Sequence, residues 1–183
     1  DLINEGVDAV PSVSPALFLA TGGIGQGESL LYPFGGISGK TTVFCNESGE
    51  FSIYLSDRYG FNNPDSEWDS LQTKWALVGD SFTQGACVKP GEEIAGQIRQ
   101  ITGGESTLNL GASGISLLME LAVLKEYAEQ RKPEIVLWVY WEGNDIPGLK
   151  IERSVSVLMH YLEPSFSQNL IHRQTKIDKI LKN

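Results

Sequence analysis

Ser81 stands in a short, glycine-bounded turn of the kind that exposes a nucleophile. It lies in the segment Gly79-Asp80-Ser81-Phe82-Thr83-Gln84-Gly85, directly after the apolar run Trp75-Ala76-Leu77-Val78. A serine in a tight turn between a strand and a helix presents its hydroxyl and its backbone N–H at one place. Acyl transfer needs both a nucleophile for the carbonyl carbon and hydrogen-bond donors for the oxygen that becomes negative. The residue types around Ser81 therefore fit acyl-transfer chemistry.

Two more polar loops follow apolar runs further along the chain. Gly111-Ala112-Ser113-Gly114 follows Thr107-Leu108-Asn109-Leu110, and Glu142-Gly143-Asn144-Asp145 follows the run from Ile135 to Trp141. In an open parallel sheet the loops after the strands meet at one edge, where ligands bind. We therefore expect these two loops to lie beside the serine turn.

The residues of the three loops divide into reacting and supporting groups. The backbone N–H of Gly114 and the side-chain amide of Asn144 are expected to join Ser81 as donors to an oxyanion. A carboxylate in a turn more often accepts backbone N–H groups than it reacts, so we assign Asp80 to the support of the loop. The same supporting role is expected for three further residues, Gly79, Gly143 and Asp145.

In this order, the three loops resemble the sequence blocks of the SGNH (GDSL-type) hydrolases, a family of serine esterases. The first block corresponds to Gly79-Asp80-Ser81 followed by Gly85, the second to Asn109–Gly114, and the third to Gly143-Asn144-Asp145. The segment from Asp57 to Pro64 also resembles a stretch that precedes the serine block in some bacterial members. The resemblance thus covers roughly half of the chain.

The resemblance implies a fold and an activity. It implies an α/β fold, a flavodoxin-like three-layer α/β/α sandwich with a parallel sheet, in which Ser81, Gly114 and Asn144 are catalytic. The implied reaction is hydrolysis of a carboxylic ester through an acyl-enzyme on Ser81, without a cofactor or a metal. Small O-acyl groups are the implied substrates, such as an acetyl group on a carbohydrate, and the implied setting is the bacterial cell envelope or the exterior.

The family's general base has no counterpart in this chain. SGNH hydrolases carry an Asp-x-x-His block near their end, in which the histidine deprotonates the serine. This chain lacks that block, and His160 and His172 are expected to be surface or packing residues. We expect the base beyond Asn183, in a domain that is incomplete here. Two alternatives stay open: an inactive carbohydrate-binding or scaffold module, and an O-acyltransferase on the same fold.

The elements that must position these residues divide the chain at about residue 68. Residues 1–68 predict an irregular arm with short strands at 42–45 and 51–54, and residues 69–183 predict the α/β domain. Its strands are expected at 75–78, 107–110 and 135–141, with at least one further strand outside the visible pattern. Because the last run is apolar on both alternating faces, it predicts a central strand covered by helices on both sides.

The helices are predicted from apolar spacing. Residues 92–101 and 117–128 predict helices between the strands, and Lys132-Pro133 ends the second one. Two stripes after the sheet are expected to face the core. They comprise Ile151, Val155, Leu158, Met159 and Leu162, and then Phe166, Leu170, Ile177 and Leu181.

Composition excludes several partners. With 14 basic and 23 acidic residues, the net charge of −9 disfavours nucleic acid and anionic lipid. No window approaches the roughly 20 apolar residues of a membrane helix. Whether Cys45 and Cys87 pair is left open. The segment from Gly35 to Thr41 resembles a phosphate-binding loop, but its first glycine is displaced and no amphipathic helix is predicted after it.

Overall fold

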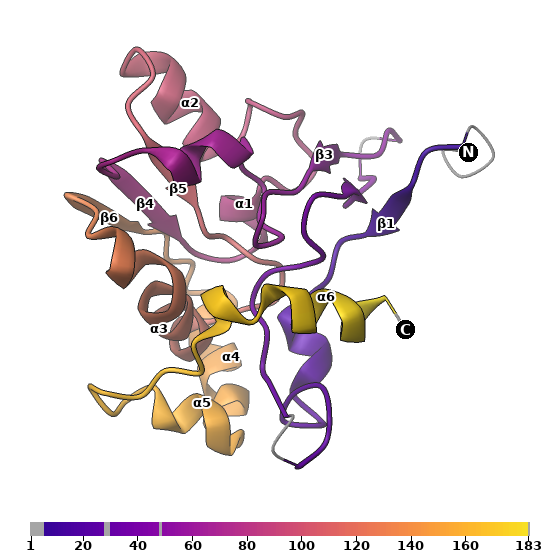
Figure 1. The fold of residues 1–183 in the computed structure, drawn as a ribbon, viewed down its shortest axis with the longest axis vertical. Helices are drawn as coiled ribbons and strands as arrows, with labels where there is room; N and C mark the ends of the chain where they lie inside the picture. The colour runs from indigo at the N-terminus through magenta and orange to yellow at the C-terminus, as the bar shows by residue number, and fades with distance from the viewer. Residues whose placement is uncertain (1–5, 28–29, 48, 183) are drawn as a thin grey trace.

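The chain has a mixed α/β fold with two three-stranded sheets (Figure 1). The computed structural model describes residues 6–27, 30–47 and 49–182, so parts of the predicted arm and Asn183 lie outside the described residues. The main sheet consists of β4 (Trp75–Val78), β5 (Thr107–Asn109) and β6 (Ile135–Trp138) in the order β5-β4-β6. All three strands are parallel, as the sequence predicts.

The helices follow the strands along the chain. After β4 come α1 (Ser81–Gln84) and α2 (Ile94–Ile101). After β5, α3 (Leu117–Val123) continues into the π-helical turn η4 (Leu124–Ala128) and the 3-10 turn η5 (Glu129–Arg131). Lys132 ends this segment with φ +47°, next to the proline predicted to stop it. The last elements are α4 (Asp145–Glu152), α5 (Ser156–His160), η6 (Leu170–His172) and α6 (Gln174–Leu181).

The arm carries the second sheet. Its strands are β1 (Ala9–Pro11), β2 (Thr41–Val43) and β3 (Ile53–Leu55), with β1 parallel and β3 antiparallel to β2. Two 3-10 turns accompany these strands: η1 (Pro15–Phe18) lies between β1 and β2 in the sequence, and η3 (Asp65–Asp69) follows β3. The two short strands predicted in the arm are therefore present, each displaced by one or two residues.

Aromatic residues of the arm contribute to the same core as the main sheet. Tyr32 and Phe34 are buried, and their ring centroids lie 5.6 Å apart. Phe34 also contacts Tyr161, which follows α5, at 5.9 Å between ring centroids. Because burying one such side chain contributes about 1.5–3 kcal/mol, these contacts hold the arm against the rest of the chain.

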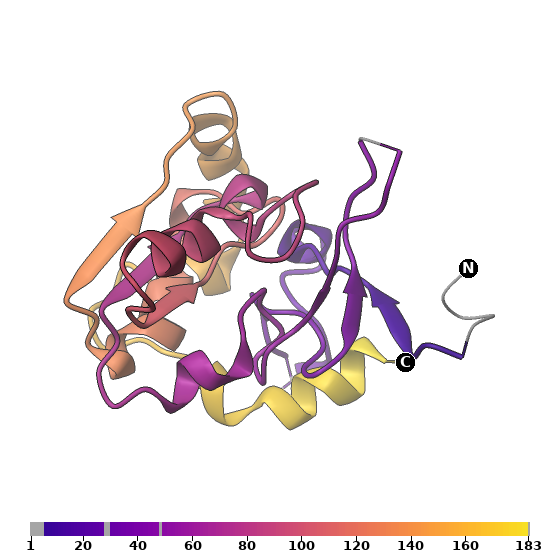
Figure 2. The same ribbon diagram turned by 90° about the horizontal axis from the view of Figure 1, so that it is seen from above.

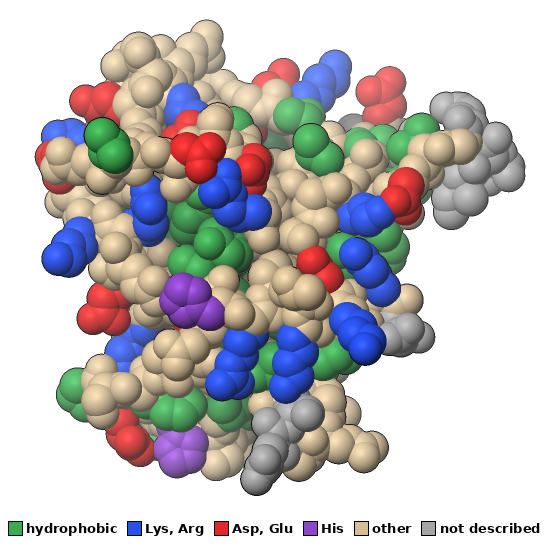
Figure 3. Space-filling view, viewed as in Figure 1, with side chains coloured by type: hydrophobic (Ala, Val, Ile, Leu, Met, Phe, Trp, Pro, Cys, Tyr) green, Lys and Arg blue, Asp and Glu red, His purple; other side chains and the backbone are tan. Residues whose placement is uncertain are grey.

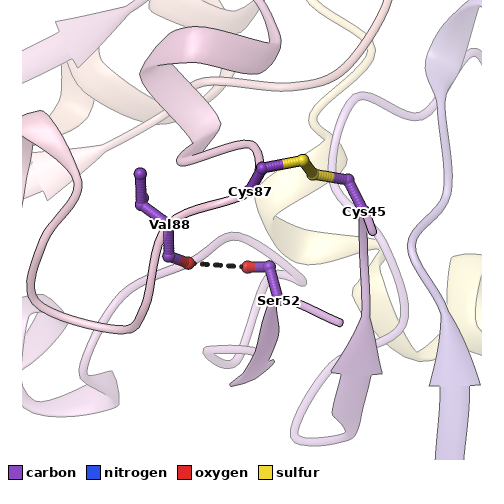
Figure 4. The surroundings of a disulfide bond; sticks show 4 residues. All are labelled: Cys45, Ser52, Cys87 and Val88. Atoms are coloured by element: carbon purple, nitrogen blue, oxygen red, sulfur yellow. Dashed lines mark hydrogen bonds between the residues drawn. A yellow bond between two sulfur atoms is a disulfide. The ribbon is translucent and has the colours of Figure 1, made fainter. Parts of the chain in front are cut away.

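A disulfide joins the arm to the loop after α1. Cys45 and Cys87 are bonded, with their Cα atoms 5.2 Å apart across 42 residues of sequence (Figure 4). The hydroxyl of Ser52 donates to the carbonyl oxygen of Val88 at 2.8 Å beside this bond, as Figure 4 shows. The two segments are thus connected by one covalent and one hydrogen bond.

The prediction of a central, doubly covered third strand is wrong. β6 pairs with β4 and lies at the edge of the main sheet, where Figure 2 shows it at the left margin of the molecule. Val136 and Trp138 keep 44% and 43% of their surface exposed. An edge strand can carry the same apolar composition as a central one, so composition does not distinguish them. The described part of the sheet has no fourth strand.

One further expectation needs correction. Ile151 and Leu162 are exposed although their stripe was predicted to face the core, because α4 and α5 are separate short helices rather than one continuous helix.

The segment resembling a phosphate loop leads into β2, not into a helix. Its Gly39 N–H donates to the Asp57 carbonyl oxygen at 3.1 Å, so this N–H already has a hydrogen-bond acceptor within the chain.

Among the described residues, no helix is both long and apolar enough to span a membrane.

Candidate active site

Backbone contacts connect the loops that follow β4 and β5. The Ala112 N–H donates to the Gly79 carbonyl oxygen at 3.1 Å. A Cβ atom at Gly111 would lie 2.3 Å from the Gln84 backbone nitrogen, so only glycine permits this approach of the second loop to α1. The two loops therefore lie side by side, as the sequence predicts.

Ser81 is the first residue of α1, and its neighbours fix this turn. The Phe82 N–H donates to Asp80 Oδ1 at 2.9 Å, which caps the helix. Gly85 ends the helix in the left-handed conformation, with φ +98°, and its N–H donates to the Ser81 carbonyl oxygen at 3.1 Å. Ser81 itself is half-buried, so the turn leaves part of it accessible.

The third loop reaches the serine turn through Asn144. Asn144 Nδ2 donates to Asp80 Oδ2 at 2.6 Å, although the two residues are 64 positions apart. Only the amide NH2 of Asn144 can face this carboxylate, because its oxygen would be repelled. The carboxylate occupies one of the two amide hydrogens, which leaves the second one for another acceptor.

Gly114 lies against the arm. Its φ of +74° favours glycine, and a Cβ atom here would lie 2.8 Å from Ser14 Oγ. The Ser14 hydroxyl donates to the carbonyl oxygen of the neighbouring Ser113 at 2.7 Å. The side of Gly114 on which a side chain would stand is thus covered by the arm. No pattern in the sequence of the loops indicates this role of Ser14.

Gly143 and Asp145 shape the third loop. Asp145 Oδ2 accepts the Trp141 N–H at 2.6 Å, which closes the turn before α4. A Cβ atom at Gly143 would lie 2.7 Å from the Trp141 ring, so this ring folds back over the glycine. Burial, together with the charge of Asp80, raises the pKa of Asp145 above its usual value.

A buried carboxyl group beside β6 was not predicted from the sequence. Glu120 of α3 is fully buried, and its Oε2 accepts a 2.5 Å hydrogen bond from Trp138 Nε1 of β6. Burial raises the pKa of Glu120 to about 8, and the neighbouring charges of Asp145, Glu152 and Asp80 act in the same direction. This shift favours the protonated, neutral form of Glu120 at neutral pH. A glutamate on an otherwise apolar helix is the only sequence signal for it.

The segment from Asp57 to Pro64 supports the site from the arm. Asn62 Nδ2 donates to the carbonyl oxygen of Gln84, the last residue of α1, at 2.9 Å. Asn63 pairs with the backbone of Asn109 in β5, accepting its N–H at 2.7 Å and donating to its carbonyl oxygen at 2.8 Å. These two asparagines thus brace the helix that begins with Ser81 and the strand beside it.

The two histidines lie towards the other end of α3. His160 Nδ1 contacts Glu163 at 3.0 Å, and Lys125 of η4 donates to the Glu163 carbonyl oxygen. His172 belongs to η6, which packs against η4. Since α3 begins after the carboxyl end of β5 and runs back along the sheet, η4 lies away from the serine turn. The described histidines are therefore poorly placed to deprotonate Ser81.

The described residues contain no group of three or more His, Cys, Asp or Glu side chains arranged to hold a metal ion. In comparisons with known proteins, no family model, no curated protein and no solved structure matches this chain.

Proposed function

We propose that the chain is a serine hydrolase that cleaves carboxylic esters, with Ser81 as its nucleophile. The observation that carries the proposal is the 2.6 Å hydrogen bond between Asn144 and Asp80, because it brings a side-chain amide to the turn that begins with Ser81. The resemblance of the three loops to SGNH blocks supports the same reading.

In the proposed reaction, Ser81 Oγ attacks the ester carbonyl carbon and the carbonyl oxygen becomes an oxyanion. The Ser81 N–H, in the first turn of α1, and the second amide hydrogen of Asn144 are its proposed donors, and the Gly114 N–H is the third. A general base takes the Ser81 hydroxyl proton and returns it to the leaving oxygen as the tetrahedral intermediate collapses, which releases the alcohol and leaves an acyl group on Ser81. Water then attacks this acyl-enzyme and releases the acid.

We propose a flavodoxin-like three-layer arrangement for the domain. The strand order β5-β4-β6 is parallel throughout, so the chain crosses from β4 to one neighbour and then to the strand on the other side. Such connections are right-handed in nearly all proteins. Right-handed crossings in opposite directions would place α2 and α3 on opposite faces of the sheet.

The setting proposed for this activity is the cell envelope or the exterior. The Cys45–Cys87 disulfide supports it, since such bonds persist mainly in oxidising compartments. A small acyl group on a carbohydrate is the proposed substrate, again by resemblance.

Covalent labelling tests the nucleophile directly. A fluorophosphonate should modify the protein at Ser81, as located by mass spectrometry, and Ser81→Ala should abolish the labelling. Ser113→Ala is the matched control, because Ser113 lies in the neighbouring loop and should leave the site of labelling unchanged. Labelling at another serine, or none with imidazole present, would contradict the proposal.

The missing base is tested by chemical rescue. If Ser81 lacks a general base in this chain, free imidazole should accelerate both labelling and hydrolysis of a short-chain chromogenic ester. The acceleration should rise with the fraction of neutral imidazole, which is the form that accepts a proton.

A second candidate follows from the positions of the histidines. Because the two described histidines lie away from Ser81, the chain could serve as an SGNH-like module that binds a glycan without turning it over. Such a module would keep its affinity after Ser81→Ala and would show no imidazole-dependent hydrolysis.

A further inference from the structure

Two exposed aromatic side chains next to the proposed catalytic residues contact one another. Phe82 follows Ser81 in α1, and Trp141 lies three residues before Asn144. They keep 58% and 52% of their surface exposed, and their ring centroids lie 5.6 Å apart with the rings at 88° to one another. Two exposed rings in contact with one another offer an apolar surface on which a ligand can be placed.

The two segments that carry the rings have an acidic composition, which disfavours anionic ligands. The segments 79–85 and 139–146 contain Asp80, Glu142 and Asp145 and no lysine or arginine. Basic side chains gather instead along α6, as Figure 3 shows, where Arg173, Lys176, Lys179 and Lys182 occur. A uronate, a sulfated sugar or an anionic lipid would be repelled at the rings.

The openness of the rings distinguishes between the remaining neutral ligands. A long alkyl chain is stabilised only when most of its surface leaves water, which an enclosed cleft achieves and two half-exposed rings do not. A pyranose ring is amphipathic. It can lay its C–H face on an aromatic ring and keep its hydroxyl groups in water, as amphipathic groups do at open aromatic surfaces.

We propose that Phe82 and Trp141 form a platform for a neutral pyranose unit of the glycan that carries the ester. This inference rests on the proposed function of Ser81, but its test measures binding alone and needs no hydrolysis of the ester. The two rings would bind the sugar beside the nucleophile and thereby select esters on neutral glycans over free alkyl esters.

Binding is measured in the Ser81→Ala background, so that no acyl transfer occurs. The probes are hexasaccharides of glucose, xylose, mannose and N-acetylglucosamine, with hexagalacturonate as the anionic probe and monooctanoyl glycerol as the alkyl probe. Isothermal calorimetry should detect binding of at least one neutral hexasaccharide and none of the anionic one. Trp141→Ala and Phe82→Ala should each weaken that binding about tenfold or more, as truncation of aromatic anchors does.

Two further variants control the measurement. Trp141→Phe keeps a ring at the same place and should recover part of the affinity lost in Trp141→Ala. Phe51→Ala removes a phenylalanine that is 59% exposed but lies in the arm outside the three loops, and should not change binding. Circular dichroism confirms that each variant is folded.

Each outcome separates this inference from the proposed function. Neutral-glycan binding that depends on Trp141 supports the platform even if Ser81 is never labelled, in which case the esterase proposal alone fails. Labelling of Ser81 with no binding of any neutral probe overturns the platform alone. The platform is also overturned if a neutral glycan binds Trp141→Ala as tightly as it binds the protein with Trp141. It is overturned as well if monooctanoyl glycerol binds more tightly than any neutral hexasaccharide and this binding depends on Trp141.

Discussion

The Asp80 carboxylate uses its two oxygens for two different loops: Oδ1 accepts the Phe82 N–H at 2.9 Å and Oδ2 accepts Asn144 Nδ2 at 2.6 Å. One side chain therefore caps the helix that begins with Ser81 and orients the amide of the third loop. A cap alone needs only one oxygen, so the second contact is specific to the arrangement of the site.

Substitutions of Asp80 should separate these two contacts. Asp80→Ser retains an N-cap oxygen but leaves Asn144 without its acceptor, so stability should change little while the labelling rate of Ser81 falls by about 100-fold. Asp80→Ala should lose the same rate and, in addition, about 1 kcal/mol of stability. Denaturant unfolding and fluorophosphonate kinetics measure the two effects. Equal labelling rates for Asp80→Ser and the parent protein would show that the Asn144 contact is irrelevant to reactivity.

The buried Glu120 should give folding stability a definite dependence on pH. Its pKa is raised from 4.5 to about 8 in the folded protein, chiefly by burial. Between these values the folded state keeps a proton that the unfolded state releases, so stability should fall as pH rises from about 4.5 to about 8 and then level off. Glu120→Gln stays neutral and should remove this contribution.

The Glu120 experiment compares unfolding free energies of the two proteins across that range. The difference should favour Glu120→Gln increasingly as pH rises, and Glu129→Gln, an exposed substitution in η5, is measured beside it. Burial also raises the pKa of Asp57 to about 6. Because Asp57 is present in both proteins, its contribution to the pH dependence cancels in the difference between their unfolding free energies. Parallel stability curves would show that Glu120 is not protonated at neutral pH.

Sequence was informative where local pattern determines structure. The run Trp75–Val78 predicts β4 with the bounds that the structure has, because a short apolar run before a glycine turn is a local signal. β6 has an equally apolar run, yet it is an edge strand with Trp138 exposed. Whether an apolar strand has a neighbouring strand on both of its edges depends on the rest of the sheet, and local composition does not indicate this.

In the candidate site, too, some features follow from local sequence pattern and others depend on the rest of the fold. Ser81, Asn144 and the supporting Asp80 could be proposed from loops that follow apolar runs, and the structure brings the last two into contact. The contact of Gly114 with Ser14 of the arm and the bond of Glu120 to Trp138 could not be proposed. Both depend on packing between segments that have no periodic relationship in the sequence.

The carboxylate of Asp57 should be far more important for stability than an exposed one nearby. It is fully buried and accepts hydrogen bonds from four donors, namely the backbone N–H groups of Tyr59 and Phe61, Asn63 Nδ2 and Trp68 Nε1. Asp57→Ala would leave these donors without an acceptor, and each buried orphan costs about 1–3 kcal/mol. We expect a total loss of at least about 3 kcal/mol in denaturant unfolding.

The matched control for Asp57 is Asp65→Ala. Asp65 pairs with Arg58 at 2.7 Å, but both side chains are exposed, so the loss should stay below about 1 kcal/mol. If the two variants lost similar stability, the buried network would not be what holds the segment before β4 in place.

The Cys45–Cys87 disulfide should contribute more to stability than the hydrogen bond beside it. Closing a loop of 42 residues removes entropy from the unfolded chain worth about 4 kcal/mol, whereas one hydrogen bond contributes about 1 kcal/mol. The double variant Cys45→Ser with Cys87→Ser should therefore unfold at a clearly lower denaturant concentration than Ser52→Ala, which loses only the bond to Val88. Reductant should lower the midpoint of the parent protein towards that of the double variant and leave the double variant unchanged. A parent protein insensitive to reductant, with its two thiols shown to be free, would contradict the pairing.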